Sequence, residues 1–196
     1  MPRGHVVVRA PRADDTDAVL EMWDELRTGS GRGGPLAPTA TEDELRRLLA
    51  EVAADDSYRA VVAEVDGLVV GMACFMARPM GPFVEAVVVQ IDYLHVRPAY
   101  HRRGAGRALV AAAAAFCEEI GAEHVVVNVF PQVREANRFY AKLGFSPLVV
   151  RRVASVSTLR RTLAADSAEH GRRAGVLARR RSAMAARTRA RAHTPA

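Results

Sequence analysis

Residues 91–109 read IDYLHVRPAYHRRGAGRAL, and this stretch decides the fold because a strand-forming run turns into a helix within it. The run over 85–96 is rich in Val and Ile, which predicts a central strand buried on both faces, and Pro98 ends it. Apolar side chains then recur at helical spacing as far as Gly121, which is typical of a helix and its C-cap. A strand, a short turn and a helix therefore follow one another near the centre of the chain.

The turn in this stretch has the properties of an anion site. Gly104 and Gly106 carry no Cβ, so the free N–H groups of the helix start can face a ligand. Arg102, Arg103 and Arg107 add positive charge, and a pyrophosphate is held by such convergent donors and cations. Two familiar phosphate loops are excluded, because the third glycine of a dinucleotide fingerprint and the Lys-Ser/Thr pair of a P-loop are both missing.

Hydrophobic periodicity predicts strands and helices on both sides of this unit, in a mixed α/β order. The pair Asp66-Gly67 tolerates positive φ angles and predicts a two-residue hairpin. Thr41 and Glu44 form a capping box at a helix start. The remaining expected elements are strands at 5–9, 58–65, 68–75, 124–130 and 145–156, helices at about 19–26, 42–52 and 134–143, a Gly/Pro-rich loop at 28–40 and a Pro/Gly break at 79–82.

Charge is divided unevenly along the 196 residues. Residues 151–196 hold twelve arginines and two carboxylates, a net charge of +10, so the first 150 residues carry −4 of the total of +6. An apolar fraction of 49% with 26% charged residues excludes a wholly disordered, collagen-like or fibrous chain. The sequence therefore predicts one globular domain with a basic C-terminal extension, and any contact with an anionic partner belongs to that extension.

Membrane segments, disulfides and metal sites are not expected. No apolar stretch approaches about eighteen uncharged residues, and the N-terminus lacks the apolar segment of a secretory signal, which predicts a cytoplasmic protein. Cys74 and Cys117, the two cysteines, lie in apolar segments and are expected to be reduced core thiols. The six histidines and two cysteines show no ligand spacing, so we expect no metal.

Two motifs together resemble a known family. Residues 91–109 resemble the acyl-coenzyme A binding motif of the GNAT superfamily of N-acetyltransferases, Gln/Arg-x-x-Gly-x-Gly/Ala. A second segment resembles the family's Ala-x-x-x-Tyr-x-x-x-Gly-Phe motif through Ala136, Phe139, Tyr140, Leu143, Gly144 and Phe145. The resemblance implies a GNAT-like mixed, mostly antiparallel central sheet flanked by helices, as a domain over 1–160. Residues 161–196 are then an Arg/Ala-rich extension, helical or disordered.

The chain departs from the family pattern at three places. His101 stands at the Gln/Arg position, and Val133 stands where the family often has an Asn seven residues before its Tyr. Few strand-forming residues follow Phe145, so the last hairpin is either short or completed by another subunit. Family members are often dimers, and the sequence leaves open whether this chain is a monomer or a homodimer.

The resemblance implies acetyl-CoA as the acyl donor and direct transfer of its acetyl group to a primary amine in a ternary complex. The backbone of Leu94 and Val96, with His95 between them, would meet the thioester and pantetheine arm. The pyrophosphate would lie on the turn. The turn residues assigned to cofactor binding are Arg102, Arg103, Gly104, Ala105, Gly106 and Arg107.

Acetyl transfer needs a neutral amine, although an amine's ordinary pKa is about 10, and a proton for the departing thiolate. Tyr140 matches the family's general acid; its alternative role is a core aromatic. Asp92 lies four residues before Val96, on the face of Leu94 if the strand alternates regularly, and is the candidate base, directly or through water. Asn128, near the next strand's end, either lines the substrate cleft or satisfies a bulge.

The acceptor and the role of the extension stay open. Small-molecule amines, protein N-termini and lysines all fit, and the −4 of the first 150 residues favours a cationic amine. Weak contact of the arginine-rich extension with nucleic acid is one hypothesis. The alternative to an enzyme is a non-catalytic acyl-CoA-binding regulator that uses its basic tail to contact nucleic acid or another anionic partner.

Overall fold

The computed structural model describes residues 5–28, 41–81 and 84–164. Nearly all of the loop predicted at 28–40, and the extension from 165 onward, lie outside the described residues. Contacts divide the chain into two units, Met1–Phe145 and Ser146–Ala196. The sheet and every labelled helix belong to the first unit.

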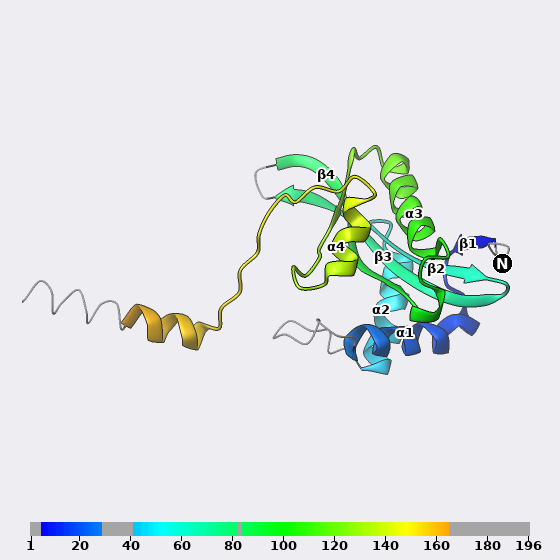
Figure 1. The fold of residues 1–196 in the computed structure, drawn as a ribbon, viewed down its shortest axis with the longest axis horizontal. Coiled ribbons are helices and arrows are strands. Elements are labelled where there is room, and N and C mark those ends of the chain that lie inside the picture. The colour runs from blue at the N-terminus through cyan, green and yellow to red at the C-terminus, as the bar shows by residue number, and fades with distance from the viewer. Residues whose placement is uncertain (1–4, 29–40, 82–83, 165–196) are drawn as a thin grey trace, which may run out of the picture. The chain divides into compact units, whose positions relative to one another are not determined.

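Five strands form one sheet in the order β1-β2-β3-β4-β5 (Figure 1). The first three pairings are antiparallel and β4 pairs with β5 in parallel, which confirms the mostly antiparallel sheet. Asp66 and Gly67 have φ angles of 51° and 80°, as the predicted hairpin requires. The strands are β1 Val6–Arg9, β2 Tyr58–Val65, β3 Leu68–Gly81, β4 Val84–Val96 and β5 His124–Val127.

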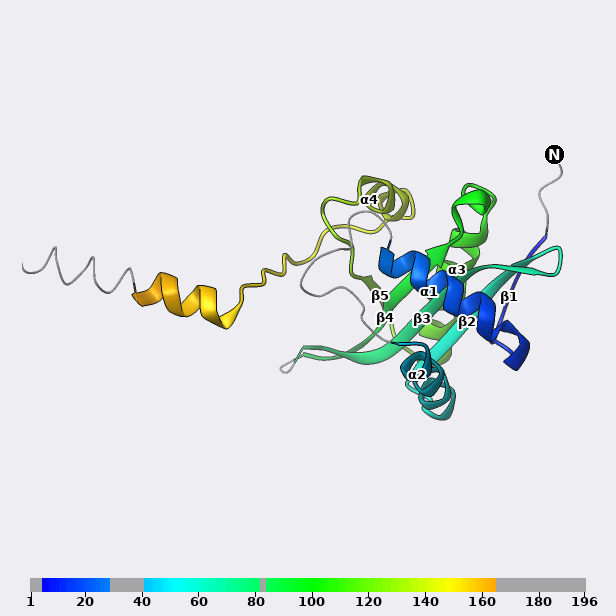
Figure 2. The same cartoon turned by 90° about the horizontal axis from the view of Figure 1, so that it is seen from below.

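Helices cover both faces of this sheet. Figures 1 and 2 show α1 and α2 on one face and α3 on the other. The capping box predicted for α2 is present, since the Thr41 side chain accepts from the Glu44 N–H and the Glu44 carboxylate accepts from the Thr41 N–H. The helices are α1 Thr16–Thr28, α2 Glu42–Ala54, α3 Ala105–Glu119 and α4 Arg134–Ala141, with short 3-10 turns at Ala13–Asp15 and Pro98–Tyr100.

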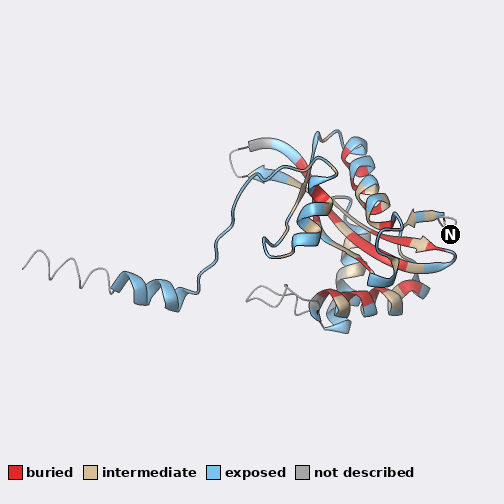
Figure 3. Cartoon of the chain, in the orientation of Figure 1, coloured by how far each residue is buried: buried red, intermediate tan, exposed pale blue. Residues whose placement is uncertain are grey.

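The core consists of two apolar layers, one on each face of the sheet (Figure 3). Phe75 and Ile91 pack with Phe116 on the α3 side, while Met22 and Met72 pack on the α1 side. This division follows from the alternation of side chains along each strand, which sends neighbouring residues to opposite faces.

Two sequence predictions were wrong. β3 extends into the break expected at 79–82 as far as Gly81, and Pro79 pairs with Val87. A proline is tolerated there because β2 pairs with β3 only as far as Met76, so no neighbouring strand needs its missing N–H. Residues 145–155 contain no strand, and 156–164 are helical. The valines at 149, 150 and 153 do not suffice, because a strand needs a paired neighbour and a covered face.

A buried ion pair ties β1 to the start of α1. Arg9 Nη1 lies 2.6 Å from Asp15 Oδ2, and Arg9 Nε donates to Glu64 at 2.8 Å. Asp15 is 6% exposed and also accepts from the Arg12 N–H at 2.6 Å. These contacts, the Arg9 hydrogen bond first, hold the pKa of Asp15 below its ordinary value. The charged carboxylate therefore stabilises the fold.

We expect Asp15→Asn to lower the free energy of unfolding by about 2–3 kcal/mol at pH 7, because it leaves Arg9 without its buried charge partner. A depressed pKa stabilises the fold above the ordinary Asp pKa of about 3.9, and this stabilisation is lost as the pH falls further. The difference from wild type should therefore shrink between pH 5 and pH 3 in urea titrations. The exposed neighbour Asp14→Asn is the control, and equal losses in both variants would contradict the role of Asp15.

Candidate functional site

β4 carries a bulge at Asp92. Tyr93 lies opposite Cys74 of β3, and Ile91 lies opposite Phe75, so no β3 residue is left to pair with Asp92. A bulge of this kind adds one residue to a strand and shifts its alternation. From Tyr93 onward, each side chain of β4 therefore lies on the opposite face of the sheet from the one that strict two-residue alternation predicts.

The bulge separates Asp92 from Leu94. Leu94 and Val96 pack with the α3-side core. Asp92 accepts a hydrogen bond from the Nε2 of Gln90, which lies on the α1 side of the sheet together with Tyr93. The expectation that Asp92 and Leu94 share a face was wrong, because period-two counting has no place for the extra residue.

Tyr93 and His95 connect this part of β4 to α1. The rings of Tyr93 and Trp23 stand edge to face with centroids 5.0 Å apart. His95 Nε2 lies 2.8 Å from Glu25 Oε2, so the imidazole faces α1. Only the backbone of His95 is then placed to meet a ligand on the α3 side of the strand.

β4 and β5 separate beyond the bulge. Their parallel pairing runs from Val88 to Ile91 on β4 and stops there. The β5-facing backbone groups of β4 from Asp92 onward, including those of Leu94 and Val96, therefore have no β5 partner. An opening between two parallel strands at their carboxyl ends is a place where a ligand can reach main-chain N–H and C=O groups.

The turn after β4 is built to present N–H groups. Arg102 and Gly104 both have positive φ angles, 63° and 102°, in alternation with ordinary residues. Successive residues of opposite hand direct their N–H groups to one side and form an anion-binding concavity. Gly104 is the N-cap of α3 and offers no side-chain cap, so helix geometry leaves the first N–H groups of α3 to a ligand or to water.

Glycine is favoured at positions 104 and 106 for different physical reasons. A Cβ on Gly104 would meet only a Val6 methyl group at 3.9 Å, so what demands glycine there is the φ of +102°. A Cβ on Gly106 would come within 3.3 Å of Phe139 Cζ, so Gly106 lets α4 pack against α3. Ala105 is buried in the core and can offer a ligand only its backbone.

His101 ties the turn back to the strand. Its Nε2 lies 2.8 Å from the carbonyl oxygen of Val96. Its Nδ1 lies 3.9 Å from Glu135 of α4. The imidazole at the Gln/Arg position thus links the strand end to the turn, and the side chains of Arg102 and Arg103 are exposed.

Tyr140 is held by aromatic contacts. It is 7% exposed and meets Phe139 and Phe145 edge to face, with centroids 5.0 and 5.3 Å apart. Its ring is therefore fixed by packing, and it nevertheless lines the pocket described next. Asn128, exposed just past the end of β5, lines the same pocket.

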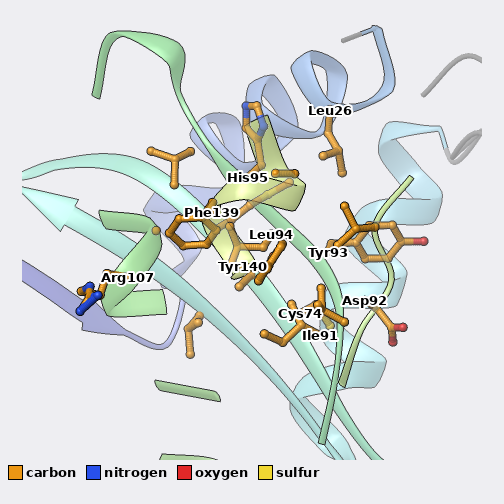
Figure 4. Close-up of a pocket in the computed structure, with 18 of the residues that line it drawn as sticks. Leu26, Cys74, Ile91, Asp92, Tyr93, Leu94, His95, Arg107, Phe139 and Tyr140 are labelled. Carbon is orange, nitrogen blue, oxygen red and sulfur yellow. The ribbon is translucent and has the colours of Figure 1, made fainter. Parts of the chain in front are cut away.

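One pocket brings the predicted site together. Every residue assigned from the sequence lines it except Ala105. In Figure 4, Asp92 and Tyr93 lie toward one end and Arg107 toward the other, with Tyr140 between them. The basic side chains that line the pocket are His95, His101, Arg102, Arg103, Arg107, Arg134, Arg138 and Lys142. Apart from His95, all of them belong to the turn, the first turn of α3, and α4 with its C-cap. The end of the pocket that these residues line therefore suits an anion, and the Asp92 end suits a cation.

Sequence reasoning missed the wall that α1 and α2 contribute. Trp23 is 9% exposed and packs in the α1-side core, yet it also lines the pocket together with Leu26, Leu49 and Val52. The helical spacing that places these residues inward is the same for a core and for a pocket wall. The sequence holds no signal that separates the two.

Cys74 lines the pocket beside Asp92. Burial, and then the charge of Asp92, raise the pKa of its thiol to about 11. Because only the thiolate is nucleophilic, this thiol is a weak nucleophile near neutral pH. We expect a Cys117→Ser variant, which keeps Cys74 as its single cysteine, to react with a disulfide reagent at pH 8 about a hundredfold more slowly when folded than in urea. Equal rates in the two states would contradict the assignment.

The described part of the chain contains no candidate membrane span and no candidate metal site. None of its helices is both long and apolar enough to cross a membrane. No group of three or more His, Cys, Asp or Glu in that part could hold a metal ion. Cys74 and Cys117 are free thiols.

Comparison with known proteins gives a consistent family. The model of the acetyltransferase (GNAT) family matches residues 19–145. Uncharacterised N-acetyltransferases of Mycobacterium tuberculosis and Mycobacterium bovis are 29% identical to this chain over 133 residues, which are 62% of this chain and 81% of theirs.

Solved structures share the fold at low sequence identity. A transcriptional regulator from Bacillus halodurans is 22% identical with a TM-score of 0.63, over 77% of this chain and 99% of that one. An aminoglycoside N-acetyltransferase in complex with CoA is 19% identical with a TM-score of 0.62, over 79% and 99%. A glucosamine-6-phosphate N-acetyltransferase from Arabidopsis thaliana is 18% identical with a TM-score of 0.60, over 78% and 99%.

Proposed function

Because the chain belongs to the acetyltransferase (GNAT) family and is therefore an acetyl-CoA-dependent acyltransferase, we propose that it transfers the acetyl group to a primary amine directly, within a ternary complex. One observation carries the proposal: a single pocket joins an anion-binding turn, a packed tyrosine and a carboxylate. These are the groups that hold a pyrophosphate, protonate a leaving thiolate and accept an amine proton.

The residues present fit acetyl-CoA, which supplies an acetyl group activated as a thioester. The concavity formed by Arg102 and Gly104 suits the pyrophosphate, with the Arg107 side chain nearby. The backbone of Leu94 and Val96, beyond the last β5 pairing, suits the amides of the pantetheine arm and the thioester carbonyl. His101 already occupies the Val96 carbonyl oxygen, so we assign the N–H groups of this segment to the ligand.

Asp92 and Tyr140 handle the protons. Asp92 takes the proton of the acceptor ammonium, directly or through one water, and Gln90 fixes its carboxylate in place. The nitrogen then forms a bond to the acetyl carbon as the carbon–sulfur bond breaks. Tyr140 donates its phenolic proton to the departing sulfur, and the proton that the acetylated nitrogen must still lose returns to the Tyr140 phenolate. Asp92 then gives its proton to water, so the products are an amide and a neutral thiol. Asn128, at the mouth of the opening, contacts the acceptor.

We expect Asp92→Asn to lower kcat/KM for amine acetylation about a hundredfold, because the amide cannot take a proton. Acetyl-CoA binding should stay at the wild-type level, since Asp92 faces away from the turn. Release of free CoA measures the rate, and calorimetry measures the binding. Asp66→Asn, in the β2–β3 turn, is the matched control, because asparagine tolerates its positive φ. Unchanged activity of Asp92→Asn over a range of pH would contradict the assigned role.

Direct transfer is supported by the high pKa of the Cys74 thiol, which is the cysteine that lines the pocket. Initial rates at varied acetyl-CoA and amine should therefore give intersecting double-reciprocal lines. Parallel lines, together with an acetylated protein detected by mass spectrometry, would overturn direct transfer in favour of a covalent relay.

The remaining assignments are also proposals. They are a domain over 1–160, an extension at 161–196, and weak contact of that extension with nucleic acid. The bounds of the domain rest on the family motifs, and the nucleic-acid contact rests on charge alone, because most of the extension lies outside the described residues. Membership of the family favours the enzyme over the non-catalytic regulator. Salt-insensitive or absent DNA binding by the full chain would remove the contact hypothesis.

A further inference from the structure

The acceptor end of the pocket has an apolar wall with one acidic group. α1 and α2 contribute Leu26, Leu49 and Val52, and the sheet contributes Tyr58 and Tyr93. Asp92 is the lining carboxylate on this face among the described residues. Figure 4 shows Leu26, Tyr93 and Asp92 toward the same end of the pocket.

Among the described residues, few ionisable side chains line this wall. His95 lines it, but its imidazole lies against the Glu25 carboxylate. Burial, and then the charge of Asp92, raise the pKa of the Tyr93 phenol above its ordinary value, so its hydroxyl stays neutral. The arginines that line the pocket belong to the turn, to the first turn of α3 and to α4, at the cofactor end. Within the described part of the chain, the wall therefore offers one negative charge and a largely hydrocarbon surface.

This chemistry selects among amines. An ammonium group is attracted to Asp92, and a hydrophobic body gains by leaving water against Leu49, Val52 and the Tyr93 ring. A polyhydroxylated amine would find few hydrogen-bond partners among the described residues of this wall beyond Asp92 and the hydroxyls of Tyr58 and Tyr93. A phosphorylated amine would find no cation there within the described residues. An amine with several ammonium groups would find Asp92 as the single lining carboxylate on this face in the part of the chain that the structure describes.

We propose that the acceptor is a small primary monoamine carried on an apolar or aromatic body, bound with its nitrogen at Asp92 and its body against the α1–α2 wall. This substrate class rests on the proposed acetyl transfer and narrows it. Leu49 and Val52 are the specificity-determining residues, and Asp92 both orients and deprotonates the amine.

The experiment uses the full chain with acetyl-CoA and three probes: 2-phenylethylamine, ethanolamine and kanamycin. We expect kcat/KM for 2-phenylethylamine to exceed that for each of the other two about tenfold or more. Calorimetric titration of 2-phenylethylamine into the protein saturated with CoA gives a second readout, independent of turnover.

A wall variant tests the location. Leu49→Gln should raise KM for 2-phenylethylamine about five- to tenfold, with kcat and the values for ethanolamine nearly unchanged. Arg46→Gln is the control, because Arg46 lies on the same helix, is exposed, and does not line the pocket. Thermal melting of both variants checks that they are folded. An equal effect of Leu49→Gln on both amines would overturn the assignment of the wall.

The outcomes separate this inference from the proposed function. Preferred acetylation of kanamycin or ethanolamine would overturn the substrate class and leave acetyl transfer to an amine in place. Failure to bind acetyl-CoA would overturn the proposed function and with it this inference. Bound acetyl-CoA with neither binding nor acetylation of 2-phenylethylamine would overturn the substrate class alone, and a wider amine screen would then test transfer itself.

Discussion

Gly104→Glu is expected to weaken acetyl-CoA binding by at least about a hundredfold, the largest effect on affinity of any single change proposed for this protein. The new carboxylate would stand at the N-cap of α3, where we propose that the N–H groups of the turn hold the pyrophosphate. Like charges at close range in a partly desolvated site repel strongly, and the side chain also fills the space of the ligand. Calorimetric titration with acetyl-CoA measures the loss.

Gly104→Gln separates charge from backbone strain. Both substitutions force a side chain into a φ of +102°, which costs roughly 1–2 kcal/mol of stability in either variant. Both side chains have the same size, so a larger loss of affinity in the glutamate variant reports repulsion from the ligand's phosphates. Wild-type affinity in a folded Gly104→Glu protein would mean that the pyrophosphate does not lie on this turn.

Tyr140→Phe is expected to lower kcat about a hundred- to a thousandfold while the dissociation constant of acetyl-CoA stays within about twofold. The substitution removes only the hydroxyl. The ring keeps its edge-to-face contacts with Phe139 and Phe145, so α4 should remain in place. Single-turnover rates of CoA release, measured beside the equilibrium binding of acetyl-CoA, separate the proton donation from binding.

Tyr100→Phe provides a matched loss of a tyrosine hydroxyl. Its ring lies under the Arg103 guanidinium, 5.2 Å from centroid to Cζ, and this contact does not need the hydroxyl. We expect its kcat to stay within about twofold of wild type. A Tyr140→Phe enzyme with full kcat would return Tyr140 to a purely packing role, and another group or water would then have to protonate the sulfur.

Local sequence determined the elements around the site and the turn itself. The glycine-arginine turn, the strand before it and the helix after it are encoded within residues 91–109, because proline and glycine act through their own backbone geometry and need no distant partner. The capping box of α2 and the Asp66-Gly67 turn are short-range for the same reason. Tyr140 was placed by its motif, and the structure adds that it lines the same pocket as the turn.

Only the tertiary structure decided on which face of the sheet Asp92 lies, that Phe139 packs against Gly106, and that the acceptor wall is apolar. The bulge arises from pairing with β3, so counting along β4 could not reveal it. Gly106 is required by Phe139, which lies more than thirty positions later in the chain. Residues 145–155 show what happens when a distant contact is missing: their valines form no strand, because no neighbouring strand pairs with them. Neighbouring residues determine local backbone conformation, whereas strand register, packing and pocket walls depend on which distant segments of the chain come into contact.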